Sequence, residues 1–456
     1  MLTDLLSLLL VGLFVAKGLQ RPYVALVGVL WIDLYQPQLL SHSFLFEQPL
    51  SLIMNIFFLI SLVLNFSKIE RPPTLLYVVI VPALMVWITL TTYNAEFPDA
   101  AWPRHDVAVK MLLFTYSIPF ILKSRKQLEL FLWILIASMS YFVLSAGMKS
   151  LMNGGGYGLD LVSDSGTVLW SEGSTLATQA ICLLPILYYA GRYSLLAGEY
   201  RPLRPLLLVV AFASLMVLIG TEARTGLIAL AALVFLTLFS SRSKLKAIVV
   251  IALLPIVSYP FVTEAWRARM ATMLNVSEES SALGRVVVWR WTLDYANEHP
   301  VMGGGFNSYL ANAGKLIAYS RGNEITIDQA EGKAFHNILV QMLGEHGYVG
   351  LLLYMALIAH ALWNSHRLSK TCPEPWQRAL ARCVFISTMV YCVGGMFIGI
   401  AFYPWLFYMY GLTIAMRKSS AVDTSEELAT PAALPASWTH EYAHAIVPRD
   451  RRALGN

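Results

Sequence analysis

The chain has 456 residues, of which 57% are hydrophobic and only 13% are charged, and its formal net charge is +5. Soluble domains carry roughly 25% charged residues, so the composition excludes an ordinary soluble enzyme. Charge-free runs such as 206–218 and 247–257 are typical of helices that cross a bilayer, where about 20 apolar residues span the hydrocarbon. The sequence therefore predicts an all-α polytopic membrane protein, and the positive charge, which lies in loops, does not indicate nucleic-acid binding.

Apolar runs follow one another along the chain, and each predicts a helix. In chain order they cover residues 3–17, 23–37, 49–65, 74–92, 106–122, 127–147, 174–191, 205–220, 224–240, 244–262, 338–364, 380–397 and 399–416. Gly394, Gly395 and Pro404 interrupt the last pair, which could form one broken unit. We expect about 12 transmembrane helices, divided into an N-terminal bundle over 1–262 and a C-terminal group over 338–416.

Basic residues are concentrated in alternate connections between these runs, which indicates the orientation of the chain. Loops rich in Lys and Arg stay in the cytoplasm. The residues concerned are Lys17, Arg21, Lys68, Arg71, Lys123, Arg125, Lys126, Arg192, Arg201, Arg204, Arg242, Lys244, Lys246, Arg367, Lys370, Arg378 and Arg382. The other connections, including the largest, 263–337, are then expected to face outward.

The outer connection 263–337 is long enough to hold helices of its own. Its aromatic and aliphatic residues argue against disorder, and loops of this length are usually functional, so we expect a loop domain with short helices. The polar tail 417–456 is expected to be cytoplasmic and disordered. The four cysteines form no C-x-x-C pair and predict neither a zinc site nor a redox pair.

Three clues to function lie on the outer side, and the first is Arg224 in the segment 221–226. An arginine at the edge of a bilayer is costly unless it is paired or lines a wet cavity, so one interpretation is an anion site. The other is a guanidinium that reaches up to lipid headgroups. The neighbouring Glu222 is a weaker candidate for a substrate contact. Glu222 and Glu345 could each orient a neighbouring group, or could equally be interfacial residues in contact with water.

The second clue is Gly284-Arg285 followed by Trp289. In a helix, Arg285 and Trp289 share one face, and the planar guanidinium matches phosphate oxygens. The alternative is an amphipathic interfacial helix. Trp289 and Tyr309 could contact sugar, although aromatic residues are common at membrane boundaries.

The third clue is His336, which directly precedes an apolar run. With an unperturbed pKa of about 6.5, a histidine can accept a proton near neutral pH, although a lone histidine is more often structural. Two arginines and a histidine on one side of the membrane form a set suited to binding a diphosphate and activating a hydroxyl. The chain has no D-x-D motif, so we expect neither a metal nor any other cofactor.

Four ordered motifs resemble the O-antigen ligase/polymerase superfamily of bacterial polytopic membrane proteins. They are 221–226, Gly284-Arg285-x-x-x-Trp289, 297–306, and His336-Asn337-x-Leu339-x-x-x-Leu343-x-Glu345-x-Gly347-x-x-Gly350. The resemblance implies a fold like that of the GT-C glycosyltransferases, in the bacterial inner membrane, with a periplasmic active site. The amino-terminal third also resembles ligases for O-glycosylation found beside exosortase systems, which leaves the acceptor open.

The resemblance also implies the partners and the roles of the site residues. The donor would be a glycan on undecaprenyl diphosphate, the acceptor a sugar hydroxyl of the lipid A–core oligosaccharide, and the surroundings membrane lipids. Arg224 and Arg285 would hold the donor diphosphate and His336 would be the catalytic base. An O-antigen polymerase or a protein O-oligosaccharyltransferase would use the same donor, and a lipid-linked glycan transporter is the alternative from another class.

Overall fold

The computed structural model describes residues 2–429 except 42, 47, 71–73, 154–168, 241–247, 249–258, 272–279 and 321–331. Within these residues every element is a helix. The elements are α1 (Leu2–Gly18), α2 (Pro22–Tyr35), α3 (Pro37–Leu40), α4 (Leu50–Leu64), η1 (Phe66–Lys68), α5 (Leu75–Tyr93), α6 (Pro98–Ile121), α7 (Arg125–Asn153), α8 (Gly173–Tyr193), α9 (Leu195–Glu199), α10 (Leu203–Gly220), α11 (Arg224–Ser240), η2 (Tyr259–Phe261), α13 (Glu264–Ala271), α14 (Ser280–Glu298), η5 (Ser308–Asn312), η6 (Leu316–Tyr319), α15 (Ile338–Thr371), α16 (Pro375–Gly395) and α17 (Pro404–Ala429).

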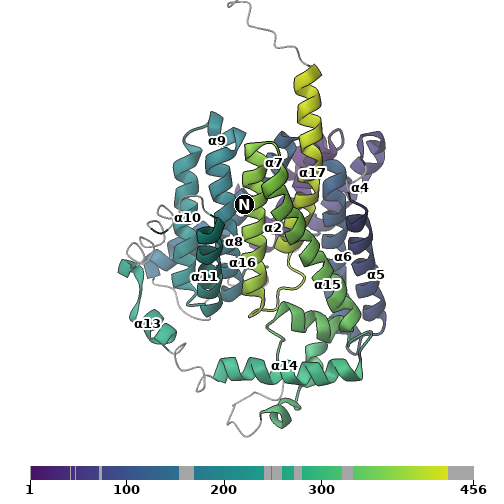
Figure 1. Cartoon of the computed structure of the whole chain (residues 1–456), viewed down its shortest axis with the longest axis vertical. Coiled ribbons are helices and arrows are strands. Elements are labelled where there is room, and N and C mark those ends of the chain that lie inside the picture. Colours follow the sequence, from purple (N-terminus) through teal and green to yellow (C-terminus); the bar gives the residue numbers. More distant parts are fainter. Residues whose placement is uncertain are drawn as a thin grey trace, which may run out of the picture.

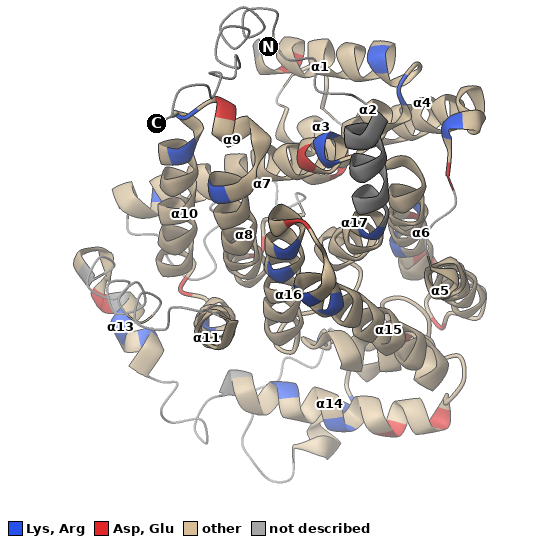
Figure 2. Cartoon of the chain, turned by 45° about the horizontal axis from the view of Figure 1, so that its top comes forward, with Lys and Arg blue, Asp and Glu red and all other residues tan. Residues whose placement is uncertain are grey.

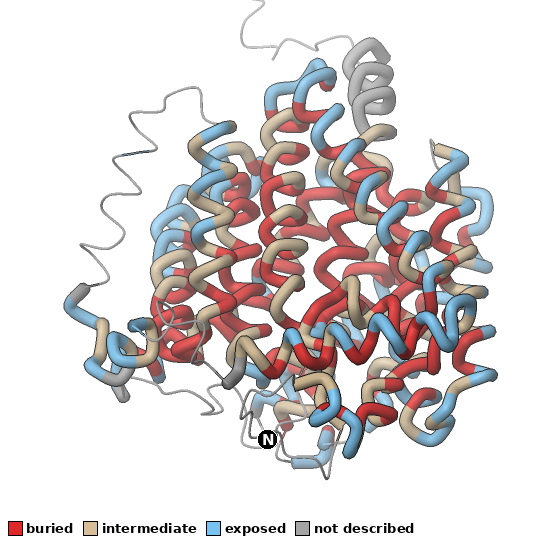
Figure 3. Tube along the Cα trace, turned by 60° about the horizontal axis from the view of Figure 1, so that its bottom comes forward, coloured by how far each residue is buried: buried red, intermediate tan, exposed pale blue. Residues whose placement is uncertain are grey.

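The helices form the bundle of a polytopic membrane protein, which confirms the expected fold class. Among the described residues, seven helical segments are long and apolar enough to cross a bilayer, and α4 and α11 are shorter apolar helices. Large apolar side chains also point away from the bundle: Val63, Leu75 and Leu208 are 76%, 78% and 71% exposed. Figure 3 shows exposed positions along the outer helices and buried ones inside. Because soluble proteins avoid broad apolar surfaces, this pattern fits contact with lipid.

The long helices run between two distinct ends of the bundle. Asn307 donates a hydrogen bond to the carbonyl of Ala100 near the start of α6, whereas Lys123, just past its other end, forms an ion pair with Glu70 at 2.7 Å. With 24 residues and a rise of 1.5 Å per residue, α6 is roughly 36 Å long, which is enough to cross about 30 Å of hydrocarbon. The helix therefore joins opposite faces.

The two ends differ in character. Helix α14 lies crosswise over the end where α6 begins, below the long helices in Figure 1. At the other end, Arg21, Lys68 and Lys123 line a small cavity, and Figure 2 shows further Lys and Arg at the helix ends that come forward there. We call these the α14 end and the basic end.

Several elements differ in extent from the sequence prediction. Helix α15 continues to Thr371, beyond the expected end at 364. A helix that leaves the bilayer keeps its backbone hydrogen bonds in water, but its residues there are no longer apolar, so hydropathy does not reveal this part. Helix α17 continues through Ala429, beyond the expected start of a disordered tail at 417, and α14 has 19 residues where short helices were expected. The last two apolar runs form separate helices, α16 and α17. Most of the run 244–262 and the tail 430–456 lie outside the described residues.

Candidate functional site

His336 lies at the α14 end in the segment that leads into α15. Its φ of +49° is in the left-handed region, which costs a non-glycine residue on the order of 1–3 kcal/mol and is concentrated at functional sites. The residues on either side hold this conformation. The Asn337 side chain caps α15 by accepting from the backbone N–H groups of Leu339 and Val340, and the carbonyl of Phe335 accepts from Trp289 Nε1 at 2.8 Å.

Two cationic side chains, Arg285 on α14 and Lys333 in the segment before α15, interact with His336. Arg285 lies one turn before Trp289 and interacts electrostatically with both Lys333 and His336. A Cβ at Gly284 would lie 2.4 Å from Lys333 Nζ, so the lysine packs directly against the start of the Gly-Arg motif. The Asn312 side chain fixes the backbone of Lys333 with two hydrogen bonds of 2.8 Å: its Oδ1 accepts from the Lys333 N–H and its Nδ2 donates to the Lys333 carbonyl.

These neighbours determine the protonation of His336. Burial, followed by the charge of Arg285, lowers the pKa of the imidazole below its usual value of 6.5, and Lys333 adds to this effect while the Glu172 carboxylate opposes it. Burial and Arg285 likewise lower the pKa of Lys333. A lowered histidine pKa means that the neutral form persists at neutral pH. His336 is therefore able to accept a proton there.

Arg224 is connected to this region through the start of α8. Glu172 caps α8 by accepting from the N–H groups of Ser174 and Thr175, and a Cβ at the next residue, Gly173, would lie 3.4 Å from Thr221. Thr221 begins the turn that leads to Arg224, the first residue of α11. Arg224 is thus connected to His336 only through this turn and through Glu172 at the start of α8, which interacts electrostatically with His336. Arg285 interacts with His336 directly.

The predicted substrate contact Glu222 belongs to the turn itself. Its φ is +49° and it is only 6% exposed, so the interpretation as a residue in contact with water is wrong. The carbonyl of Glu222 accepts from Arg269 Nε at 3.2 Å, and the carbonyl of Arg269 accepts from Arg224 Nη2 at 3.4 Å. The turn is therefore tied to α13.

The glycine-rich segment 303–305 packs against a kink in α15. Gly347 interrupts that helix with φ +65° and ψ −170°, and Gly303 has φ +64°. A Cβ at Gly303 would lie 2.6 Å from the Gly347 nitrogen. The N–H groups of Gly304 and Gly305 donate to the carbonyls of Gly344 and Glu345 at 3.0 and 2.8 Å. The glycines thus let two backbones meet closely, which agrees with a role in loop shape.

A cavity of about 180 Å³ adjoins the segment that carries His336. We call it the aromatic cavity. Its lining includes Tyr309, one of the predicted sugar contacts, together with Ala334 and Phe335, and also Arg104, Val107, Ala108, Phe306, Asn307, Gln341, Glu345, Gly399, Phe402 and Tyr403. Trp289, which was also predicted to contact sugar, holds the backbone at Phe335 through its indole N–H.

Sequence reasoning missed several of these groups. The sequence did not indicate a role for Lys333, because its packing partner Gly284 is remote in sequence. Glu172 could have been suspected as a helix cap from its position before Gly-Ser-Thr. Glu345 was expected to contact water, but it is 2% exposed. In the described part of the chain, no three or more His, Cys, Asp or Glu side chains form a group that could hold a metal ion.

Comparison with known proteins divides the chain into two parts. Residues 2–195 match a family of unknown function, DUF5935, and residues 209–355 match the O-Antigen ligase family. No curated protein matches the chain. The second match contains the turn at Arg224, the α14 motif and the segment around His336. Over residues 209–355 the chain is therefore similar to the O-antigen ligase superfamily.

Proposed function

We propose that the protein is an O-antigen ligase of lipopolysaccharide biosynthesis. It would transfer a glycan from undecaprenyl diphosphate to a sugar hydroxyl of the lipid A–core oligosaccharide, on the periplasmic face of the bacterial inner membrane. The observation that carries this proposal is the cluster of Arg285, Lys333 and His336 inside the segment that matches the O-Antigen ligase family.

In this proposal the donor diphosphate binds beside α14. Arg285 donates charge-assisted hydrogen bonds to phosphate oxygens, and Lys333 supplies a second positive charge next to it. Arg224 lies on the neighbouring turn and contacts the more distant phosphate. These charges matter most when negative charge develops on the leaving oxygen.

His336 acts as the general base. The acceptor oxygen forms a bond to the anomeric carbon while the bond from that carbon to the diphosphate oxygen breaks and its electron pair leaves with the diphosphate. The hydroxyl proton passes to the imidazole. A single displacement inverts the anomeric carbon, and proton transfer of this kind contributes typically 10²–10⁴-fold to the rate.

The position of the cluster favours an enzyme over a transporter. Secondary transporters hold their substrate near the bilayer midplane, whereas His336 precedes the first residue of α15 and α14 lies across one end of the bundle. The site is thus at a membrane boundary, where a lipid-linked diphosphate is found.

The test is transfer by the purified protein in detergent. We expect glycan transfer from a lipid-diphosphate donor to lipid A–core, and loss of that transfer in His336→Ala, Arg285→Ala and Arg224→Ala at normal protein levels. Asp106→Asn, which alters an exposed ion pair with Lys110, is the control and should retain activity. Full activity in His336→Ala would overturn the assignment of the base.

The same assay separates the acceptors. Offering a second lipid-linked repeat or a peptide with Ser and Thr in place of lipid A–core distinguishes an O-antigen polymerase and a protein O-oligosaccharyltransferase from the ligase. If one of these is the better acceptor, the reaction class stands and the acceptor assignment falls.

A further inference from the structure

The aromatic cavity is lined by Ala334 and Phe335, the two residues that precede the candidate base His336, but it differs chemically from the cationic cluster. Along the segment 333–336, Lys333 packs against α14, Ala334 and Phe335 line the cavity, and His336 follows. The same short segment thus borders the cluster that holds Arg285 and the cavity. A reaction at His336 could draw one substrate from each of them.

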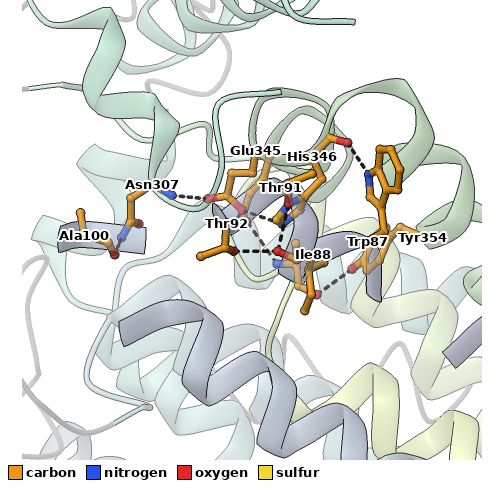
Figure 4. Close-up of polar contacts among 11 residues, drawn as sticks. Trp87, Ile88, Thr91, Thr92, Ala100, Asn307, Glu345, His346 and Tyr354 are labelled. Atoms are coloured by element: carbon orange, nitrogen blue, oxygen red, sulfur yellow. Dashed lines mark hydrogen bonds and ion pairs between the residues drawn. The ribbon is translucent and has the colours of Figure 1, made fainter. Parts of the chain in front are cut away.

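A buried carboxylate dominates the polar lining of the cavity. Glu345 accepts one hydrogen bond from the Asn307 N–H at 3.1 Å, shown in Figure 4, and one from Gln341 Nε2 at 3.2 Å. Both donors are neutral amides. A carboxyl group keeps acceptor sites beyond these two hydrogen bonds whether it is ionised or protonated, and Glu345 lines the cavity, so acceptor capacity remains for the hydroxyl group of a ligand.

The remaining lining is suited to a sugar. The aromatic side chains of Phe306, Phe335 and Phe402 supply apolar surface, while Gln341 and Tyr403 carry polar groups. Arg104 is exposed and interacts electrostatically with both Glu345 and Tyr403. A sugar hydroxyl both donates and accepts hydrogen bonds, so it can pair with a carboxylate and with a guanidinium at once.

Arg104 is the cation in this lining and interacts with the buried Glu345, so the cavity suits an uncharged ligand better than a diphosphate. The negative charges of a diphosphate would lie against a buried carboxylate, and like charges at short range repel. The cavity volume of about 180 Å³ corresponds to on the order of six water molecules at about 30 Å³ each. This is room for a single sugar unit rather than for a chain of them.

We propose that the aromatic cavity seats the terminal sugar of the acceptor, with Glu345 accepting a hydrogen bond from one of its hydroxyl groups and Arg104 donating to the ring substituents at the mouth. This inference rests on the proposed function, because it divides the two substrates of that reaction between the cluster and the cavity. The sugar presents its reacting hydroxyl toward His336.

The test is the Michaelis constant for each substrate, measured separately in detergent. In Glu345→Gln the acceptor KM should rise by about tenfold or more, the usual effect of losing a hydrogen bond to a charged group, while the donor KM stays unchanged. Arg104→Gln should raise the acceptor KM as well. Because Arg104 is exposed, this variant is expected to fold even if the other does not.

Two matched controls exclude a general effect of the substitutions. Asp106→Asn removes an exposed charge from the same helix as Arg104, and Glu129→Gln removes a carboxylate that is also buried but pairs with Arg125 near the basic end. Both should leave the acceptor KM unchanged. A donor KM that rises in Glu345→Gln or Arg104→Gln, or an acceptor KM that does not change in either, would overturn the assignment of the cavity.

Direct binding separates this proposal from the proposed function. The free core oligosaccharide should bind the purified protein without any donor, and Arg104→Gln should weaken that binding. If the oligosaccharide binds in this way but no transfer occurs with any acceptor, the proposed function fails and the sugar site stands. If transfer occurs and depends on His336 while neither variant affects the acceptor, the sugar site fails and the function stands.

Discussion

At the scale of single residues, the site depends on how charge and burial change the pKa of the His336 imidazole. Burial and two cationic neighbours lower the pKa of His336, and the left-handed backbone holds the ring beside them. Glycosyl transfer needs positive charge for the leaving group and an uncharged base for the hydroxyl. Under the proposed function, Arg285 next to His336 would provide both, because the charge that would bind the donor also lowers the pKa of the proposed base.

This arrangement predicts the pH dependence of transfer. Since neutral His336 is the active form, kcat/KM for the donor should fall by about tenfold per pH unit on the acid side, with an inflection below 6.5. Bound diphosphate brings negative charge, which favours the imidazolium and raises its pKa. The acid limb of kcat should therefore lie at higher pH than that of kcat/KM.

The variant Arg285→Gln tests this pH dependence. Removing the neighbouring cation should move the acid limb of the residual activity to higher pH, because Arg285 is the leading charge that lowers the pKa of His336. Profiles measured in parallel for the wild-type protein, Arg285→Gln and Asp106→Asn would show whether the shift is specific. An acid limb that stays in place in Arg285→Gln would contradict the assignment.

At the scale of elements, the site depends on the contact between the 303–305 loop and the kink of α15. The Tyr348 N–H donates to the carbonyl of Pro300 at 2.9 Å, and Gly347 has the glycine-only combination of φ +65° and ψ −170°. The kink positions Glu345 just before it, so that the carboxylate receives the Asn307 N–H and lines the cavity. Gly347 thus determines both how the 303–305 loop packs and where Glu345 lies in the cavity.

Substitution of that glycine should disrupt the contact. In Gly347→Ala the new Cβ would lie 2.3 Å from the carbonyl oxygen of Val301, in addition to backbone strain of about 1–3 kcal/mol. We expect a lower Tm in detergent and a higher acceptor KM. Gly314→Ala is the matched control, since its φ is +69° but a Cβ there meets no atom within 4 Å. An equal loss of Tm in both variants would mean that the close contact contributes nothing.

The sequence predicted the elements better than the contacts between them. Helix α11 covers the expected 224–240, and α5 differs from the expected 74–92 by one residue at each end, because hydropathy reports how much chain lies in lipid. The burial of Glu345 was not predictable, since it depends on Asn307 and Gln341 around it. The sequence could single out Arg285 and His336 as candidates because their residue types suit phosphate and proton chemistry. Lys333 became a candidate only through its packing against Gly284 in the structure.

At the scale of the whole molecule, the two ends of the bundle differ in charge and in content. The site and the aromatic cavity lie at the α14 end, and Arg21, Lys68 and Lys123 line a cavity at the other. Positively charged loops remain in the cytoplasm, and α6 is long enough to join the two faces. These facts together favour a cytoplasmic basic end and a periplasmic site.

Cysteine labelling tests that orientation. In Lys315→Cys the new thiol replaces an exposed side chain close to η6 at the α14 end, and in Lys126→Cys it replaces one at the start of α7, at the basic end. A membrane-impermeant maleimide, applied to cells with a permeabilised outer membrane, should label the first and should label the second only after lysis. The unsubstituted chain is the blank, because three of its four cysteines are buried and the fourth is partly buried. Labelling of Lys126→Cys in intact cells together with protection of Lys315→Cys would put His336 in the cytosol. A lipid-linked donor could then react there only before it crossed the membrane, which is incompatible with a periplasmic ligase.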